Sequence, residues 1–212
     1  MYVYTRIEVG TMSITRIKMK KLDWLKHKDV IQDMVVLEVD GSVNKNPGHF
    51  GIVGVYNPSD QTITAYKYKG NRLTNQLLEM LAIYHGLETF QLLHEHNNEH
   101  NNEHEYSEHE YRYERKCAIV SDSLTTINIL VGIQNVRNPR LVHLKQLIEQ
   151  KIDSMSIDNV FTDIYLVYRR GHTRHDYVGK YITNLVKYYN RTNNEPDIEY
   201  GLLQPLIEQL QW

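Results

Sequence analysis

The order of hydrophobic patterns in the first half of the chain most constrains its fold. Residues 34–43 indicate a strand that runs into a Gly-Ser turn at 41–42. The β-branched side chains of this run are typical of a strand buried on both faces. Residues 50–56 and 62–68 follow as two further strand patterns, separated by an Asn-Pro-Ser-Asp turn. From residue 74 to 93 the apolar residues recur with the spacing of an amphipathic helix. The sequence therefore predicts an antiparallel meander of three strands followed by a long helix.

The second half of the chain alternates short strands with helices. Apolar strand patterns occur at 116–121 and 162–168. Helical patterns occupy residues 123–130, 140–152 and 175–189. Helical crossovers place the later strands parallel to the first one. We therefore expect an α/β domain with a five-stranded mixed sheet flanked by helices.

Composition divides the chain into regions. Glu, His and Asn repeat in residues 94–115, which hold seven Glu and two Arg and so carry a charge of −5. The formal net charge of the whole chain is −2, so the remaining residues carry +3. Such a polar, repetitive segment predicts a solvated, disordered insertion. We expect a basic N-terminal extension at 1–33, a core domain at 34–189 that contains this insertion, and a C-terminal tail at 190–212.

Histidine spacing in this insertion offers an alternative metal site. His96, His100 and His104 would share one face if the segment were helical, and could then chelate a metal ion. The repeat produces this spacing by itself, so we favour a solvated segment.

Nothing in the sequence predicts a membrane segment. No run of about 18 apolar residues occurs, and residues 1–21 lack the apolar stretch of a secretory signal. The single cysteine, Cys117, cannot form an internal disulfide and lies in an apolar run, where strand packing is its expected role. We expect an intracellular protein, in the cytoplasm or the nucleus.

Three acidic residues occupy positions that suggest a metal site. Asp40 ends the first predicted strand and Asp122 ends a later parallel strand, and the carboxyl ends of neighbouring parallel strands meet in a crevice. Glu79, in the first turns of the long helix, can join them if that helix crosses the same edge. Three close carboxylates repel one another unless a cation lies among them, and such oxygen ligands suit Mg²⁺ or Mn²⁺. Taken singly, each acid has a structural alternative as a turn, capping or solvated residue.

Four motifs resemble those of type 1 ribonuclease H. Residues 39–42, Val-Asp-Gly-Ser, resemble the opening motif of that family, and 74–82 are similar to its TNxxxELxA helix. Residues 120–123 resemble its TDS-like motif, and 168–172 its late loop that ends in Gly-His. The motifs occur in the family's order. The resemblance implies a ribonuclease H-like fold and hydrolysis of the RNA strand of RNA–DNA hybrids with two divalent ions, Mg²⁺ or Mn²⁺.

The resemblance also implies a role for each matched residue. Asp40, Glu79 and Asp122 would be metal ligands. His172 would assist proton transfer or product release, with His175 as a competitor for that role. Four neutral polar residues would contact the backbone of the hybrid: Asn46, Thr74, Asn75 and Gln76. The alternative role of these four is turn formation and helix capping.

One position departs from the family pattern. The fourth metal ligand of the family is an Asp on the last helix, two residues before a Leu. That position falls on Thr183 when it is counted from the buried face, and on Asn184 when it is counted from Gly179. Asp176 lies at the helix start, more than a turn too early by this count. A neutral ligand would weaken the second metal site, so a catalytically weak or inactive nucleic-acid-binding module is the alternative function.

Other substrate contacts are less clearly indicated. Residues 134–140 are too short to form the basic handle of many bacterial members of the family. Substrate binding could therefore depend on the basic segment 18–28 or on a protein partner, and nothing in the sequence specifies such a partner. Trp24 in that segment could anchor it to the core or stack on nucleic acid. A DNA-directed nuclease or integrase is a third possibility, which the pairing of Asp-Gly-Ser with TNxxxE disfavours.

Overall fold

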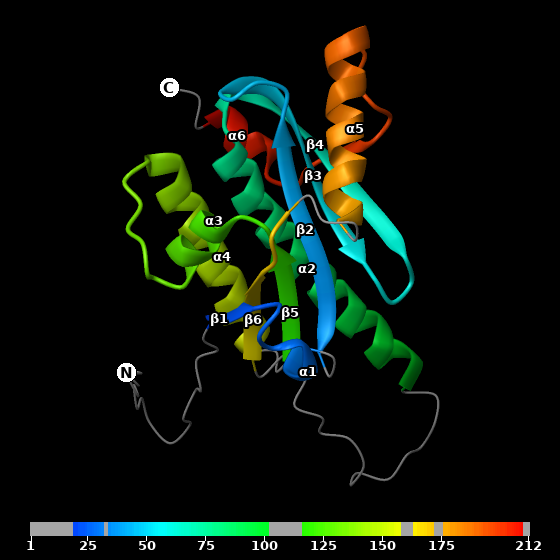
Figure 1. The fold of residues 1–212 in the computed structure, drawn as a ribbon, viewed down its shortest axis with the longest axis vertical. Helices are drawn as coiled ribbons and strands as arrows, with labels where there is room; N and C mark the ends of the chain where they lie inside the picture. The colour runs from blue at the N-terminus through cyan, green and yellow to red at the C-terminus, as the bar shows by residue number, and fades with distance from the viewer. Residues whose placement is uncertain (1–18, 32–33, 102–115, 158–162, 172–175, 210–212) are drawn as a thin grey trace, which may run out of the picture.

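The computed structural model describes residues 19–31, 34–101, 116–157, 163–171 and 176–209. Its strands form one mixed sheet in the order β1-β6-β5-β2-β3-β4-β7 (Figure 1). The strands are β1 Met19–Asp23, β2 Val35–Val43, β3 Gly48–Asn57, β4 Thr62–Leu73, β5 Lys116–Ser121, β6 Asp163–Tyr168 and β7 Glu199–Tyr200. The helices are α1 Lys28–Ile31, α2 Asn75–Asn101, α3 Leu124–Leu130, α4 Pro139–Ile157, α5 Tyr177–Thr192 and α6 Gln204–Gln209.

The sheet has the mixed topology that the sequence predicts. β2, β3 and β4 pair as an antiparallel meander, and β5 and β6 join β2 in parallel. The expected number of five strands is too low, because β1 pairs in parallel with β6, and β7 pairs with β4 at the other edge. These edge strands have the short sequences MKKLD and EY, which show no apolar alternation. They join the sheet through backbone pairing, which a side-chain pattern does not report.

Both flanking regions thus contribute to one sheet. β1 precedes the boundary expected at 33/34, and β7 follows the boundary expected at 189/190. Trp24 is half-buried against the apolar cluster that α1 forms with β5 and β6, as an anchor would be. Gln204 of α6 binds the backbone of Lys69 in both directions, at 2.9 and 3.0 Å.

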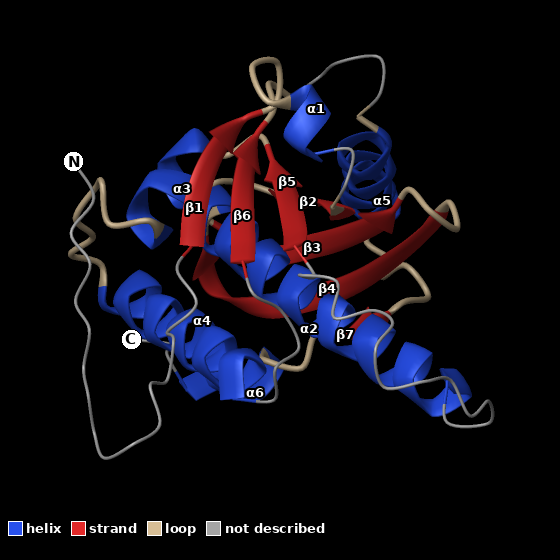
Figure 2. Ribbon diagram, turned by 90° about the horizontal axis from the view of Figure 1, so that it is seen from below, coloured by secondary structure: helices blue, strands red, loops and turns tan. Residues whose placement is uncertain are grey.

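The helices cover the two faces of the sheet unequally. α2, α3, α4 and α6 lie on one face, whereas α5 and the short α1 lie on the other (Figure 2). The larger core, with Leu37, Leu78 and Phe90, fills the space under α2. On the opposite face α5 lies directly on β3, because a Cβ at Gly54 would lie 2.7 Å from methyl groups of both Val178 and Ile182. The absence of a side chain at Gly54 therefore fixes the height of α5 above the sheet.

The long helix extends further than the sequence predicts. α2 continues to Asn101, so the expectation of disorder is wrong for the first part of the insertion. Neither Gly nor Pro interrupts this stretch, and Glu favours a helix. Residues 102–115 and the side chains of His96, His100 and His104, which carry the zinc alternative, lie outside the described part of the structure.

Cys117 is buried in β5, and burial raises the pKa of its thiol, which agrees with a packing role. Among the described residues, no helix combines the length and the apolarity that a membrane span needs.

Candidate metal centre

Asp40 lies within β2 rather than at its end. The strand continues to Val43 and pairs with β3 as far as the Val43–Gly51 pair, so the prediction that Asp40 ends the strand is wrong. On the other side β2 pairs with β5 only from Val35 to Glu38. Because β5 ends before it reaches the level of Asp40, a crevice opens on that side of the strand, and the side chain of Asp40 lines it.

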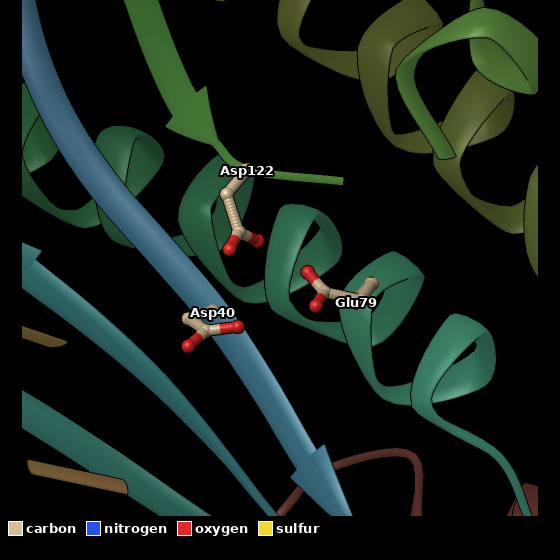
Figure 3. A group of neighbouring side chains, drawn as sticks. All are labelled: Asp40, Glu79 and Asp122. Atoms are coloured by element: carbon tan, nitrogen blue, oxygen red, sulfur yellow. The ribbon is translucent and has the colours of Figure 1, made fainter. Parts of the chain in front are cut away.

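The three acids that the sequence singled out lie together. Asp122 directly follows β5, Glu79 comes from the first turns of α2, and their carboxylates point toward that of Asp40 (Figure 3). One carboxylate oxygen from each residue lies within 4.8 Å of the others. Gly41 permits this approach, since a Cβ there would lie 2.6 Å from the backbone nitrogen of Glu79. A larger residue at position 41 would therefore push α2 away from β2.

Burial and mutual repulsion make this cluster unfavourable as free anions. Burial first, and then the charge of Asp122, raises the pKa of Asp40 to about 7, although the Gly41 N–H donates to its Oδ1 at 2.7 Å. Burial and the charges of Asp40 and Asp122 raise the pKa of Glu79 well above its usual value. Glu79 Oε2 is buried without a hydrogen-bond partner among the described residues. A cation would offset this repulsion and take up the unpartnered oxygen, so the residues fit a hard divalent ion.

A fourth carboxylate, that of Asp176, faces the same site. Asp176 is the N-cap of α5 and accepts a hydrogen bond from the Gly179 N–H at 3.0 Å. A Cβ at Gly179 would lie 2.5 Å from Asp176 Oδ1 and 2.7 Å from Asp40 Oδ2, so these two oxygens converge on one point. The charge of Asp176 also contributes to the raised pKa of Asp40. The count along the sequence, which places Asp176 more than a turn before the fourth position, does not reveal that its carboxylate faces this site.

Thr183 and Asn184, the two neutral candidates for the fourth ligand, do not face this site. Asp40, Asp122 and Asp176 line one small pocket, and neither Thr183 nor Asn184 is among the described residues that line it. They lie about 10–12 Å further along the axis of α5, at 1.5 Å per residue. A sequence signal for Asp176 was present, since Asp176 lies two residues before the buried Val178, the spacing sought for the fourth acid.

Basic and small residues of the late loop complete the pocket. Arg169 donates from Nη1 and Nη2 to the two carboxylate oxygens of the buried Glu38, at 2.5 and 2.6 Å. The guanidinium lies 5.4 Å from the Trp24 ring, so it forms part of the pocket wall rather than a solvated basic surface. Gly171 is in contact with Asp122, because a Cβ at this position would collide with its carboxylate. His172 and His175, the candidates for proton transfer, lie outside the described residues.

The predicted nucleic-acid contacts lie at the start of α2. Asn46, Thr74 and Gln76 line a second pocket together with residues of the α3–α4 connection, namely Gln134, Asn135, Arg137 and Asn138. Thr74 Oγ1 accepts from the Leu77 N–H at 3.2 Å, and Asn46 Oδ1 accepts from the Asn75 N–H at 3.4 Å. The capping alternative therefore applies to Thr74 and Asn46, while both still border an open, polar groove. Asn75 is not among the described lining residues.

Comparison with known proteins finds similarity at the level of structure. No protein-family model and no curated protein matches the chain. The N-terminal RNase H domain of Rv2228c from Mycobacterium tuberculosis, solved as a fusion with maltose-binding protein, aligns with a TM-score of 0.51 and 19% identity over 75% of this chain and 97% of that one. LC11-RNase H1, isolated from compost by a metagenomic approach, aligns at 0.52 and 15% over 74% and 99%. Its complex with an RNA/DNA hybrid aligns at 0.50 and 14% over 73% and 98%. At these identities the similarity concerns the fold.

Proposed function

We propose, from the ribonuclease H fold that this chain has, that it is an endonuclease that hydrolyses the RNA strand of RNA–DNA hybrids with two divalent cations, Mg²⁺ or Mn²⁺. The observation that carries this proposal is the cluster of the Asp40, Glu79 and Asp122 carboxylates, from β2, α2 and the end of β5. Asp176, at the start of α5, faces Asp40 in the same crevice. The solved complex of LC11-RNase H1 with an RNA/DNA hybrid supports the choice of substrate.

In this proposal Asp40, Glu79, Asp122 and Asp176 hold the ions. Asp176 replaces Thr183 and Asn184 as the fourth ligand, since its carboxylate converges with that of Asp40. Bound ions would activate a water molecule and stabilise the leaving oxyanion of the phosphodiester. The alternative of a weak or inactive module depended on a missing fourth acid, and the position of Asp176 favours the active enzyme.

The chain itself orients these ligands. The Gly41 N–H holds one oxygen of Asp40, and the Gly179 N–H holds one oxygen of Asp176. Fixed ligands of this kind reduce the reorganisation that catalysis requires. His172 remains our proposed residue for proton transfer or product release, because a histidine titrates near neutral pH.

The groove at the start of α2 would contact the hybrid. The side chains of Asn46, Thr74 and Gln76 offer neutral donors and acceptors that contact phosphates and 2′-hydroxyls without reading a base sequence. Asn75 would contribute at the rim. Arg137, which lines the same groove, adds a cation for a phosphate.

A cleavage assay tests the proposal. The protein is incubated with a labelled RNA–DNA hybrid, a DNA duplex or an RNA duplex, in Mg²⁺, in Mn²⁺ and in EDTA. We expect metal-dependent cleavage of the hybrid alone, lost in Asp122→Asn and kept in Asp197→Asn, which changes an exposed aspartate outside the pocket. Binding of the hybrid without cleavage in either metal would instead establish the non-catalytic module.

A further inference from the structure

The outer face of α5 carries a row of exposed aromatic side chains. Tyr177, Tyr181 and Tyr188 are 50%, 40% and 46% exposed, although tyrosine rings usually bury much of their apolar surface. The inner face of the helix, with Val178 and Ile182, packs on β3. Tyr181 and Tyr188 therefore do not hold the helix on the sheet. Tyr177 contacts Tyr56 of β3 but still exposes half of its surface.

Basic residues accompany this row on the same helix. Lys180, Lys187 and Arg191 are exposed, and α5 contains no Asp or Glu. With 3.6 residues per turn, the three tyrosines fall within an arc of about 40°, and the three cations fall in an adjacent arc of about the same width. We call these six residues the α5 stripe.

The two rows together match the chemistry of an unpaired nucleic-acid strand. Exposed aromatic rings provide stacking platforms for bases, and neighbouring cations pair with phosphates, in a way that is independent of sequence. The helix rises about 6 Å from Tyr177 to Tyr181 and about 10 Å from Tyr181 to Tyr188. Both steps exceed the rise of about 3.4 Å per base in a duplex strand. Bases that stack on these rings must therefore belong to an unstacked, extended strand.

The position of the first platform is defined. The ring of Tyr177 lies 5.5 Å from that of Tyr56 on β3, centroid to centroid, so the two rings support each other at the start of the helix. The residue before Tyr177 is Asp176, whose carboxylate faces Asp40 in the candidate metal centre. The α5 stripe thus begins beside the site that would cut a phosphodiester and extends away from it along one helix.

We propose that the α5 stripe binds a single-stranded nucleic-acid segment that continues from the hybrid at the metal centre. This inference rests on the proposed function. A protein partner fits less well, because protein interfaces, although enriched in Tyr and Arg, are depleted in Lys, and two of the three cations of the stripe are lysines. A strand leaving the site would follow the helix, with bases on the tyrosines and phosphates on the row of cations.

Direct binding gives the first test. The affinity for fluorescent single strands of about 12 nucleotides, within the usual site size of such surfaces, is measured by anisotropy in EDTA, where no cleavage occurs. We expect Tyr181→Ala and Tyr188→Ala each to weaken binding about tenfold. Lys187→Ser with Arg191→Ser should reduce the dependence of log affinity on log salt by about 0.7 for each cation removed. Tyr200→Ala is the matched control, since Tyr200 is 45% exposed on β7 at the far edge of the sheet.

Cleavage gives the second test and separates the two proposals. A blunt hybrid is compared with the same hybrid carrying a single-stranded extension. We expect a lower KM for the extended hybrid, and an advantage that shrinks in Tyr181→Ala/Tyr188→Ala but not in Tyr200→Ala. Single-strand binding that depends on the stripe, without cleavage of either hybrid, would overturn the nuclease and keep the stripe. Cleavage of the blunt hybrid, with single-strand binding that the stripe variants do not alter, would overturn the stripe alone.

Discussion

Asp176, at the start of α5, lies close enough to Asp40 in the middle of β2 for its charge to raise the pKa of the Asp40 carboxyl. Both carboxylates face Gly179, whose missing side chain leaves the space between them open. The charge of Asp122, at the end of β5, also raises the pKa of Asp40. Three further elements therefore place negative charge around Asp40: the end of β5 with Asp122, α2 with Glu79, and the start of α5 with Asp176.

Replacement of Asp176 tests the fourth ligand. We expect Asp176→Asn to lower Mg²⁺-dependent cleavage of a hybrid about 100-fold or more, because one ion loses a charged ligand and with it several kcal/mol of transition-state stabilisation. Thr183→Ala and Asn184→Ala should stay near the wild-type rate. Initial rates over a range of Mg²⁺ concentrations make the measurement. A large loss in either neutral variant, with Asp176→Asn fully active, would return the fourth position to the middle of the helix.

The raised pKa of Asp40 predicts how the stability of the metal-free protein depends on pH. Folding raises this pKa from 3.8 to about 7, so between these values the folded state binds more protons than the unfolded state, and stability falls as pH rises through that window. In EDTA near pH 8 we expect Asp40→Asn to raise Tm by at least about 3 °C, the shift for about 1 kcal/mol in a chain of this size. Mg²⁺ should raise the Tm of the wild type more than that of the variant. Thermal melts that show no difference in EDTA would contradict the repulsion.

We expect the loss of one partner of the Glu38–Arg169 ion pair to destabilise the protein more than the loss of both partners. Arg169→Met leaves the carboxylate of Glu38 buried and uncompensated, which we expect to cost about 3–5 kcal/mol of unfolding free energy. Glu38→Leu with Arg169→Met should recover much of that loss, since apolar replacements of buried pairs are often neutral or stabilising. Urea unfolding of the single and the double variant gives the comparison. Equal losses in both would show that the packing of Arg169 on Trp24, rather than the charge, supports the pocket.

Gly171 should be required for metal binding more than for folding. A Cβ at this position collides with the carboxylate of Asp122, so Gly171→Ala must displace that ligand. We expect Mg²⁺ affinity, measured by calorimetry in the absence of nucleic acid, to fall at least about tenfold, within the range for misplaced ligands. Arg170→Ala, an exposed neighbour, is the control and should keep the affinity. Unchanged affinity in Gly171→Ala would mean that Asp122 does not hold an ion in this position.

A chain shortened to residues 34–189 tests the domain boundaries. Its loss of β1 uncovers the edge of β6, and its loss of residues 190–212 removes the amide of Gln204 from the backbone of Lys69. We expect this chain to unfold at a lower urea concentration than residues 19–209. Its free energy of unfolding should be lower by about 2 kcal/mol or more, since each buried backbone hydrogen bond left unmade costs about 1–3 kcal/mol. Equal stability of the two chains would confirm 34–189 as a complete domain.

Local patterns in the sequence predicted most of the central elements. The run 34–43 and the apolar run 116–121 became the adjacent parallel strands β2 and β5, and the helical period from residue 74 became α2. Such patterns work because a strand or helix buried on a known face repeats its apolar residues along the chain. The end of β2 was predicted incorrectly, since Gly41 and Ser42 look like a turn but pair with β3. Backbone pairing with a neighbour decided that boundary.

The sequence by itself determined which elements carry Asp40, Glu79 and Asp122, because each residue follows or interrupts a regular apolar pattern, and it left open whether those elements adjoin. Only the tertiary structure decided that Asp176 joins them and that Thr183 and Asn184 do not. That outcome depends on where α5 crosses the sheet, which the packing of Val178 and Ile182 over Gly54 sets. Spacing along a helix is encoded locally, whereas the contact of its first residue with a distant strand depends on how two surfaces fit together.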